Sequence, residues 1–209
     1  MIKQLSGCCY EWVGGDFNVK FLDDFSHEKR HDFQKIPRFY KPLSDRKPTD
    51  KVKRFTQAEI LPVRDIIEPI ICKYGRFDLC GSFRRGKDTV KDLDYVINTS
   101  RQEFIRLRSE LTMAGVNFQR GAMEIMNGSI NGIACDFFRA DSDSYTSILI
   151  WRTGSKDHNI YCAAVAMRKG LRVVRNGIKL KDGTIFHPKT EDEFYHHLGV
   201  KPMLPNERG

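Results

Sequence analysis

The chain has 209 residues, of which 40% are hydrophobic and 30% are charged, as is typical of a soluble globular protein with an apolar core. No apolar run approaches the roughly 20 residues that a membrane-spanning helix needs, and the first residues lack the charged-then-apolar pattern of a secretory signal. The sequence therefore predicts neither a membrane protein nor a secreted precursor, and its length fits one domain or two small lobes.

Six cysteines are present: Cys8, Cys9, Cys72, Cys80, Cys135 and Cys162. They show no paired Cys-x-x-Cys spacing, and several lie inside apolar runs. This pattern predicts buried thiols of an intracellular protein in a reducing compartment, rather than disulfides or zinc ligands.

The net charge of +8 is concentrated in residues 27–54, which hold ten Lys or Arg against four Asp or Glu. Three prolines predict an irregular connection here, and aromatic residues are interleaved with the charges. Such an arm suits a polyanion, because each phosphate contact releases condensed counterions. The alternative is a solvated arm without a ligand. The ten basic residues are Lys29, Arg30, Lys35, Arg38, Lys41, Arg46, Lys47, Lys51, Lys53 and Arg54.

The first predicted elements are a hairpin and a helix. Within the first 25 residues, the alternating stretch Phe17–Phe21 predicts a short hairpin. A helix is expected after Thr56, whose side chain can form a capping box with Glu59. Because proline removes a helical hydrogen bond, Pro62 and Pro69 predict a kink or a late start.

The later elements predict a mixed fold. Strands are expected at Phe77–Phe83 and Asp92–Asn98, and a helix after Ser100. Asn127-Gly128 predicts the turn of a hairpin whose second strand ends at Phe138. The remaining elements are helices around 144–151 and 157–169, a hairpin that turns at Asn176-Gly177, and a short helix between Thr190 and Gly199. This order predicts an α+β fold with a mixed, antiparallel-rich sheet and a small C-terminal α/β lobe.

Candidate phosphate- and metal-binding residues lie in the segment Gly81-Ser82-Phe83-Arg84-Arg85-Gly86 and in Asp92-Leu93-Asp94, which follows it. The Gly-Ser turn offers N–H groups and a hydroxyl to phosphate oxygens; Arg85 adds charge, and Arg84 either binds phosphate or braces the carboxylates. Side chains alternate along a strand, so Asp92 and Asp94 share a face where both can bind a divalent cation. The alternative is an exposed acidic loop. The pattern predicts metal-assisted phosphoryl or nucleotidyl transfer.

A third carboxylate is expected from Asp136, in the otherwise apolar run Ile133–Phe138, where an unpaired acid is costly. If this strand neighbours Asp92–Ile97, Asp136 completes a site for two Mg²⁺ ions, with Mn²⁺ as a substitute. Asp141 and Asp143 lie among serines and are interpreted as loop or cap residues.

These residues resemble the motif of family X DNA polymerases, the group of DNA polymerase beta. Two further stretches follow in the family's order: Thr153-Gly154-Ser155 with Asn159, and Thr190-Glu191 before Leu198-Gly199 and a tail from Pro205 to Arg208. The resemblance covers residues 55–209 and implies a nucleotidyltransferase palm followed by a lobe that selects the nucleotide.

The resemblance also implies roles for single residues. Asp92, Asp94 and Asp136 resemble the metal-binding catalytic triad, in which Asp136 also helps to activate the primer 3′-hydroxyl. Ser82 and Arg85 resemble ligands of the incoming triphosphate. The implied nucleotide-binding residues are Gly81, Ser82, Arg84, Arg85, Trp151, Thr153, Gly154 and Asn159.

The chain departs from the family pattern in three ways. Arg152 stands where a second aromatic residue is common, which puts sugar discrimination in doubt. Ala163 stands where replicative-like members carry an arginine that checks the template, which predicts relaxed base-pair discrimination. No lyase domain or helix–hairpin–helix motif is visible in residues 1–55, so the chain resembles the small viral members and is expected to lack lyase activity.

The sequence therefore predicts a monomeric, template-directed DNA polymerase that fills short gaps in DNA repair, with gapped or primer-template DNA and dNTPs as its partners. Residues 1–54 are interpreted as an N-terminal extension with a DNA-binding arm, 55–142 as the palm and 143–209 as the nucleotide-selecting lobe. The alternatives are a template-independent terminal transferase, an enzyme that modifies RNA or a small molecule, and a non-catalytic DNA-binding scaffold.

Overall fold

The computed structural model describes residues 9–13, 16–20 and 53–209, apart from the side chains of the first two segments and of residues 120–122. By their contacts, the residues form two units, Met1–Val52 and Lys53–Gly209. In the first unit, strands β1 (Cys9–Val13) and β2 (Asp16–Lys20) pair antiparallel, which confirms the predicted hairpin. The eight predicted DNA-binding residues from Lys29 to Lys51 lie outside the described residues.

The second unit is built on a five-stranded sheet with the order β4-β6-β9-β8-β7. Its strands are β4 (Arg76–Leu79), β6 (Asp92–Asn98), β7 (Asn117–Ala122), β8 (Ile125–Ile130) and β9 (Ile133–Ala140). Strands β6 and β9 are parallel, and every other neighbouring pair is antiparallel. The mixed, antiparallel-rich sheet is therefore confirmed. Short strands β3 (Phe55–Thr56) and β5 (Thr89–Val90) pair beside it.

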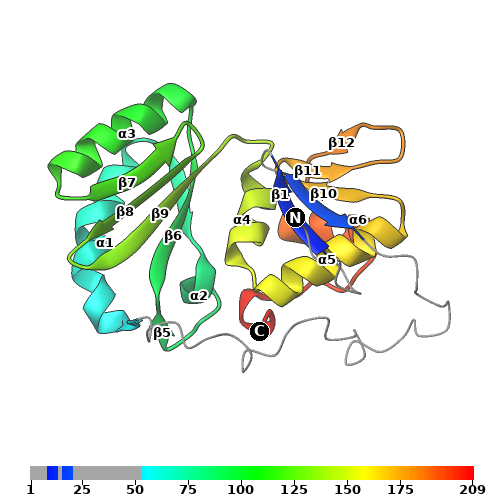
Figure 1. Cartoon of the computed structure of the whole chain (residues 1–209), viewed down its shortest axis with the longest axis horizontal. Helices are drawn as coiled ribbons and strands as arrows, with labels where there is room; N and C mark the ends of the chain where they lie inside the picture. Colours follow the sequence, from blue (N-terminus) through cyan, green and yellow to red (C-terminus); the bar gives the residue numbers. More distant parts are fainter. Residues whose placement is uncertain (1–8, 14–15, 21–52) are drawn as a thin grey trace. The chain divides into compact units, whose positions relative to one another are not determined.

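Helices cover both faces of this sheet (Figure 1). Helices α1 (Gln57–Cys72) and α3 (Arg101–Met113) pack on one face, where Leu93, Tyr95 and Ile97 of β6 are fully buried. Helix α4 (Tyr145–Thr153) packs on the other face, against a cluster that includes Val96 and Phe138. Because side chains alternate along β6, the face toward α4 also receives Asp92 and Asp94.

Helix α1 begins directly after Thr56, and the predicted late start is wrong. The predicted capping box is present: the Thr56 N–H donates to Glu59 Oε2 over 2.7 Å, and the Thr56 hydroxyl accepts from the Glu59 N–H. Pro62 and Pro69 both lie inside the helix, although each removes one backbone donor. Burial of one apolar face of α1 against the sheet offsets that loss.

The turn predicted at Asn127-Gly128 is also wrong, because both residues lie within β8. The chain turns instead at Asn131-Gly132, where both φ angles are positive (52° and 78°), as a type I′ turn requires. Gly128 is needed for packing, since a Cβ there would lie 2.9 Å from Cγ1 of Val116. Two Asn-Gly pairs four residues apart thus compete, and tertiary packing selects the second.

The C-terminal part of the second unit has its own apolar core. Helix α5 (Lys156–Arg168), strands β10 (Arg172–Val174), β11 (Gly177–Lys179) and β12 (Ile185–Phe186), and helix α6 (Glu191–Leu198) form it, followed by a 3₁₀ turn at Pro205–Glu207. The predicted helix ends at Gly170 and Gly199 are confirmed by their positive φ angles. None of the helices in the described ranges is long and apolar enough to cross a membrane.

Glu124, between β7 and β8, joins the sheet to this C-terminal part. Its carboxylate accepts hydrogen bonds from Arg101 (2.8 Å), Arg139 (3.0 Å) and Arg175 (2.7 Å), the last from the β10–β11 turn. Burial alone raises the pKa of Glu124, but the hydrogen bonds from Arg139 and Arg101 lower it below its ordinary value. Arg175 also donates to the Arg139 carbonyl over 2.6 Å.

Candidate active site

Parallel pairing of β6 and β9 brings the three predicted carboxylates together. In the ladder, Asp94 lies opposite Asp136, and Asp92 lies opposite Ala134, so all three acids occupy the sheet face that α4 covers. The expectation that the Asp136 strand neighbours the Asp92 strand is confirmed. Asp136 is further oriented by Asn127 of β8, whose Nδ2 donates to Asp136 Oδ1 over 2.8 Å.

The pKa values of Asp94 and Asp136 are both raised. Burial, and then the charges of Asp92 and Asp136, raise the pKa of Asp94 from 3.8 to about 7. Burial also raises the pKa of Asp136, while the Asn127 hydrogen bond works in the opposite direction. Asp92 is less buried and lies 3.5 Å from the Lys91 Nζ. The cluster therefore carries an electrostatic cost that a bound cation would remove.

A glycine makes room for Asp94. The strand predicted to run to Phe83 ends at Leu79, and helix α2 (Gly81–Arg84) follows at once. Gly81 has φ +59°, and a Cβ there would lie 2.2 Å from Asp94 Oδ2. The strand prediction was wrong here because the apolar alternation continues through a turn that only this left-handed glycine allows.

These residues fit a hard divalent cation by their chemistry. All three donors are carboxylates, the ligands that Mg²⁺ prefers, and they project from neighbouring backbone positions. Within the ranges that the structure describes, no three Asp, Glu, His or Cys side chains are yet gathered as a metal-binding group. The backbone spacing is about 5 Å between neighbouring strands, so a common cation would require the side chains to rotate toward one another.

Arg84 of α2 and Arg85, which follows it, contact the C-terminal part of the unit. Arg85 Nη1 donates to the Thr153 carbonyl, and its buried Nε has no partner among the described residues. Arg84 donates to Thr153 Oγ1 (2.9 Å) and to Glu191 Oε1 (2.6 Å). Glu191 also accepts from Arg208, whose side chain is fully buried. These contacts tie α2 to the start of α6, and the two roles considered for Arg84 stay predictions.

Residues 148–209 match the family model described as DNA polymerase beta thumb. The chain is also 30% identical over 138 residues to the DNA polymerase/3'-5' exonuclease PolX of Bacillus subtilis (strain 168), an alignment that covers 63% of this chain and 24% of that protein. Both matches relate this chain to the family X DNA polymerases. It spans about a quarter of the length of the relative that it matches.

The stretch around the Gly154 turn is held by contacts with neighbouring segments. Thr153 is completely buried, and Gly154 has φ +70° with Arg85 Nη1 3.2 Å from the position of a Cβ. The Asn159 Nδ2 donates to the Trp151 carbonyl over 2.8 Å, which fixes the amide beside that turn. His158 is buried: its Nε2 lies 2.7 Å from the Tyr195 hydroxyl, and burial lowers its pKa to about 4.

Arg152 and Asn127 are parts of the site that the sequence did not reveal. The Arg152 guanidinium lies over the Phe138 ring, 3.8 Å from its centroid, and Phe138 shares a strand face with Asp136. Its charge stabilises the ionised forms of Asp94 and Asp136. The sequence predicted a turn at Asn127, so its contact with Asp136 was missed. No sequence signal predicted that Arg152 lies over the Phe138 ring.

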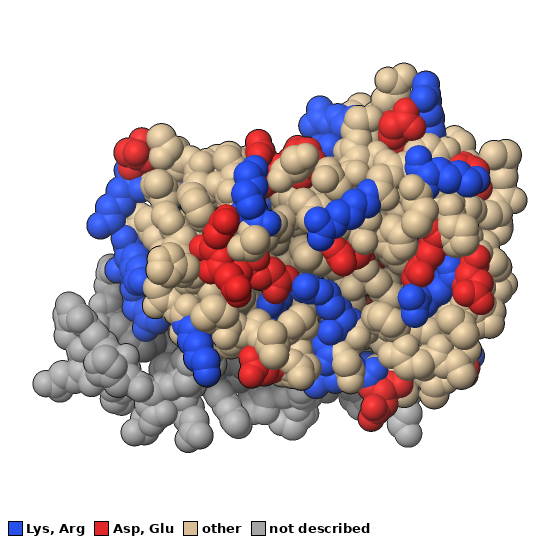
Figure 2. Space-filling model, turned by 180° about the vertical axis from the view of Figure 1, so that it is seen from behind, with Lys and Arg blue, Asp and Glu red and all other residues tan. Residues whose placement is uncertain are grey.

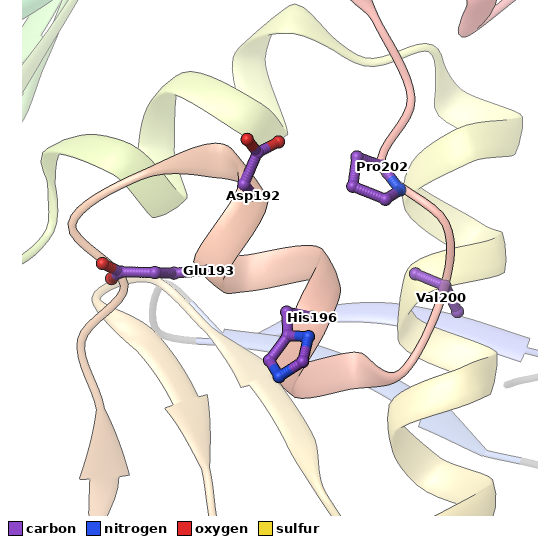
Figure 3. Close-up of a pocket in the computed structure, with 5 residues that line it drawn as sticks. All are labelled: Asp192, Glu193, His196, Val200 and Pro202. Atoms are coloured by element: carbon purple, nitrogen blue, oxygen red, sulfur yellow. The ribbon is translucent and has the colours of Figure 1, made fainter.

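A separate pocket of about 410 Å³ lies beside α6. Figure 3 shows Asp192, Glu193 and His196 on this helix, with Val200 and Pro202 on the segment that follows. None of the predicted site residues lines it. The candidate site is therefore defined by the β6–β9 carboxylates and their neighbours, and not by this pocket.

The raised pKa of Asp94 predicts a pH-dependent stability in the metal-free protein. Between about pH 4 and 7 the folded state retains a proton that the unfolded state has released, so the free energy of unfolding falls as the pH rises. In EDTA, Asp94→Asn should gain up to about 4 kcal/mol over the wild type across this window. Urea denaturation at each pH measures the difference. Asp88→Asn, at an exposed position, should show no such trend; a pH-independent difference for Asp94→Asn would contradict the prediction.

Proposed function

We propose that this chain transfers nucleotides from dNTPs to a DNA primer 3′-hydroxyl, directed by a template, and fills short gaps in DNA repair. The observation that carries the proposal is the register of β6 and β9, which aligns Asp94 with Asp136 and leaves Asp92 on the same face. The likeness to the family X DNA polymerases supports a polymerase over other nucleotidyltransferases. The proposal keeps residues 55–142 as a palm and 143–209 as a nucleotide-selecting lobe, acting as a monomer.

Asp92, Asp94 and Asp136 would hold two Mg²⁺ ions, or Mn²⁺ in their place. When bound, the cations stabilise the attacking and leaving oxygens of an in-line displacement that releases pyrophosphate. Asp136 would also help to activate the primer 3′-hydroxyl. Asn127 donates a hydrogen bond to only one oxygen of its carboxylate, Oδ1. The second oxygen, Oδ2, is then available to accept the proton of the primer hydroxyl.

The incoming nucleotide would bind between α2 and the turn at Gly154. Ser82 and Arg85 supply a hydroxyl and a guanidinium for the triphosphate, and the unpartnered Nε of Arg85 adds a donor. Gly81 keeps this segment close to Asp94, so that phosphate and carboxylate meet at one place. Trp151, Gly154 and Asn159 form the side that would contact the sugar and base.

We also propose that the basic arm within residues 27–54 binds DNA through the positive charge of its Lys and Arg side chains. Two of its ten residues are described, and both contact neighbouring side chains. Arg54 donates to Thr89 Oγ1 over 3.0 Å, and Lys53 Nζ lies 4.8 Å from the centre of the Phe55 ring. These two contacts anchor the end of the arm beside the β3–β5 pair, so the DNA-binding role rests mainly on residues 29–51.

Primer extension tests the proposed activity. With Mg²⁺ and dNTPs, the wild type should extend a primer on gapped DNA, and Asp136→Ala should reduce the rate by at least 100-fold, because both metal binding and proton transfer are lost. Ser129→Ala, at a neighbouring position of β8, should retain the wild-type rate. Extension of single-stranded DNA would move the assignment to terminal transfer, and no incorporation on any DNA would favour the scaffold.

Relaxed base-pair discrimination is the second expected property. Ala163 is buried in α5, and its methyl group cannot hydrogen-bond to a template base. Single-nucleotide insertion with each dNTP opposite each template base should therefore show weak preference for the correct pair, measured as the ratio of kcat/KM values. Strong selectivity would contradict this expectation. Ala163→Arg should raise the ratio if the position faces the template.

A further inference from the structure

His158, in the first turn of α5, is a buried polar side chain with a hydrogen bond at each ring nitrogen. Over the face seen in Figure 2, basic and acidic side chains are interspersed, and such solvated charges contribute little to a specific contact. A buried polar group is more informative, because its burial is costly unless it is hydrogen-bonded. His158 is 5% exposed; its Nε2 lies 2.7 Å from the Tyr195 hydroxyl, and its Nδ1 lies 3.2 Å from Asn159 Oδ1.

The partners of Asn159 determine which ring nitrogen of His158 carries the proton. The Trp151 carbonyl can only accept a hydrogen bond, so the amide atom that faces it at 2.8 Å is Nδ2. The amide oxygen Oδ1 therefore faces His158 Nδ1 and can only accept, so Nδ1 is the protonated nitrogen. Nε2 is left as the acceptor for the Tyr195 hydroxyl. Cys162 Sγ, 3.5 Å from Nε2, is a weaker donor to the same atom.

Burial keeps this histidine neutral. The pKa of His158 is lowered to about 4, chiefly by burial, although the hydrogen bond with Asn159 acts in the opposite direction. At neutral pH the ring therefore has one donor and one acceptor, as its two contacts require. A phenylalanine ring would make neither hydrogen bond. The histidine thus adds directed hydrogen bonds that apolar packing cannot supply.

The Asn159 amide is held from both sides as a result. Its nitrogen donates to the Trp151 carbonyl, and its oxygen accepts from His158. Together these two hydrogen bonds fix the plane of the amide and use one of its two N–H groups. Asn159 is only partly buried, so a ligand can reach it. The second N–H, for which the described residues supply no partner, is therefore a donor of fixed direction beside the Gly154 turn.

We propose that His158 is a positioning residue, which holds the second N–H of Asn159 toward the minor-groove edge of the incoming base. The inference rests on the proposed polymerase function and deepens it. Purine N3 and pyrimidine O2 are the hydrogen-bond acceptors of that edge. A single fixed donor can therefore bind any of the four dNTPs, and it adds affinity without selecting a base.

NMR of the imidazole nitrogens tests the arrangement without turnover. Near neutral pH, His158 should carry its proton on Nδ1, and its Nε2 should be unprotonated. Tyr195→Phe removes the hydroxyl donor, so the resulting shift of the Nε2 signal assigns the resonance to His158. A proton on Nε2 would overturn the inference, because Nδ1 could then not donate to the amide oxygen of Asn159.

Nucleotide analogues test the role in the reaction. On gapped DNA with a template thymine, the KM for dATP is compared with the KM for 3-deaza-dATP, in which a C–H group replaces N3. The wild type should have a KM about tenfold lower for dATP, with similar kcat, because one hydrogen bond is lost with the analogue. His158→Phe should make the two KM values equal, since the amide is no longer held. The comparison is made within each protein, so a smaller active fraction does not change it.

The matched control is His196→Phe, at an exposed position of α6, which should keep the wild-type difference. Asn159→Ala should also make the two KM values equal, and His158→Phe added to it should not raise the KM for dATP further. A full wild-type difference in His158→Phe, or equal KM values in the wild type, would overturn the inference and leave the polymerase proposal intact. Failure of the wild type to incorporate dATP on any DNA would remove the proposed function, and the inference with it.

Discussion

The parallel ladder between β6 and β9 is the constraint on which the site depends. It places Asp94 beside Asp136 and buries both against α4, where like charges and burial raise the pKa of each. Such a cluster opposes folding in the absence of a cation, because each ionised carboxylate loses hydration and repels its neighbours. The surrounding residues reduce this cost without removing it: Asn127 donates to Asp136, and Arg152 supplies a positive charge from the last turn of α4. A bound cation would remove the cost that remains.

Two charged clusters connect the carboxylate-bearing sheet to the C-terminal part of the same unit. Glu191 accepts from Arg84 of α2 and from Arg208 near the end of the chain, and Glu124 accepts from Arg139 and Arg175. In each cluster one glutamate accepts hydrogen bonds from arginines of both parts, so removal of the glutamate takes a carboxylate partner from each of these arginines. Loss of one partner of a buried pair typically costs about 3–5 kcal/mol, which makes Glu191 a determinant of how α2 is held against the C-terminal part of the unit.

Much of this arrangement follows from local sequence signals. The alternation in Asp92–Asn98 predicted both the strand and the face that its acids occupy, and the acid in the apolar run around Asp136 predicted its strand. The predictions were wrong where tertiary contacts decided between two locally allowed structures. Asn127-Gly128 has the composition of a turn, yet Gly128 is needed where Val116 packs, and Asn131-Gly132 forms the turn. The partners of Arg84 and Arg152 could not be predicted either, since Glu191 and Phe138 approach them only through the packing of distant segments.

The central claim is that the three carboxylates form a divalent-cation site, and Mn²⁺ binding measured by electron paramagnetic resonance tests it most directly. Titration of the free ion at pH 7.5 requires neither DNA nor turnover, so it separates metal binding from catalysis. The account predicts that the wild type binds Mn²⁺ and that Asp94→Asn and Asp136→Asn each weaken binding by at least tenfold, while Asp88→Asn binds as the wild type does. Equal Mn²⁺ affinity of all four proteins would contradict it.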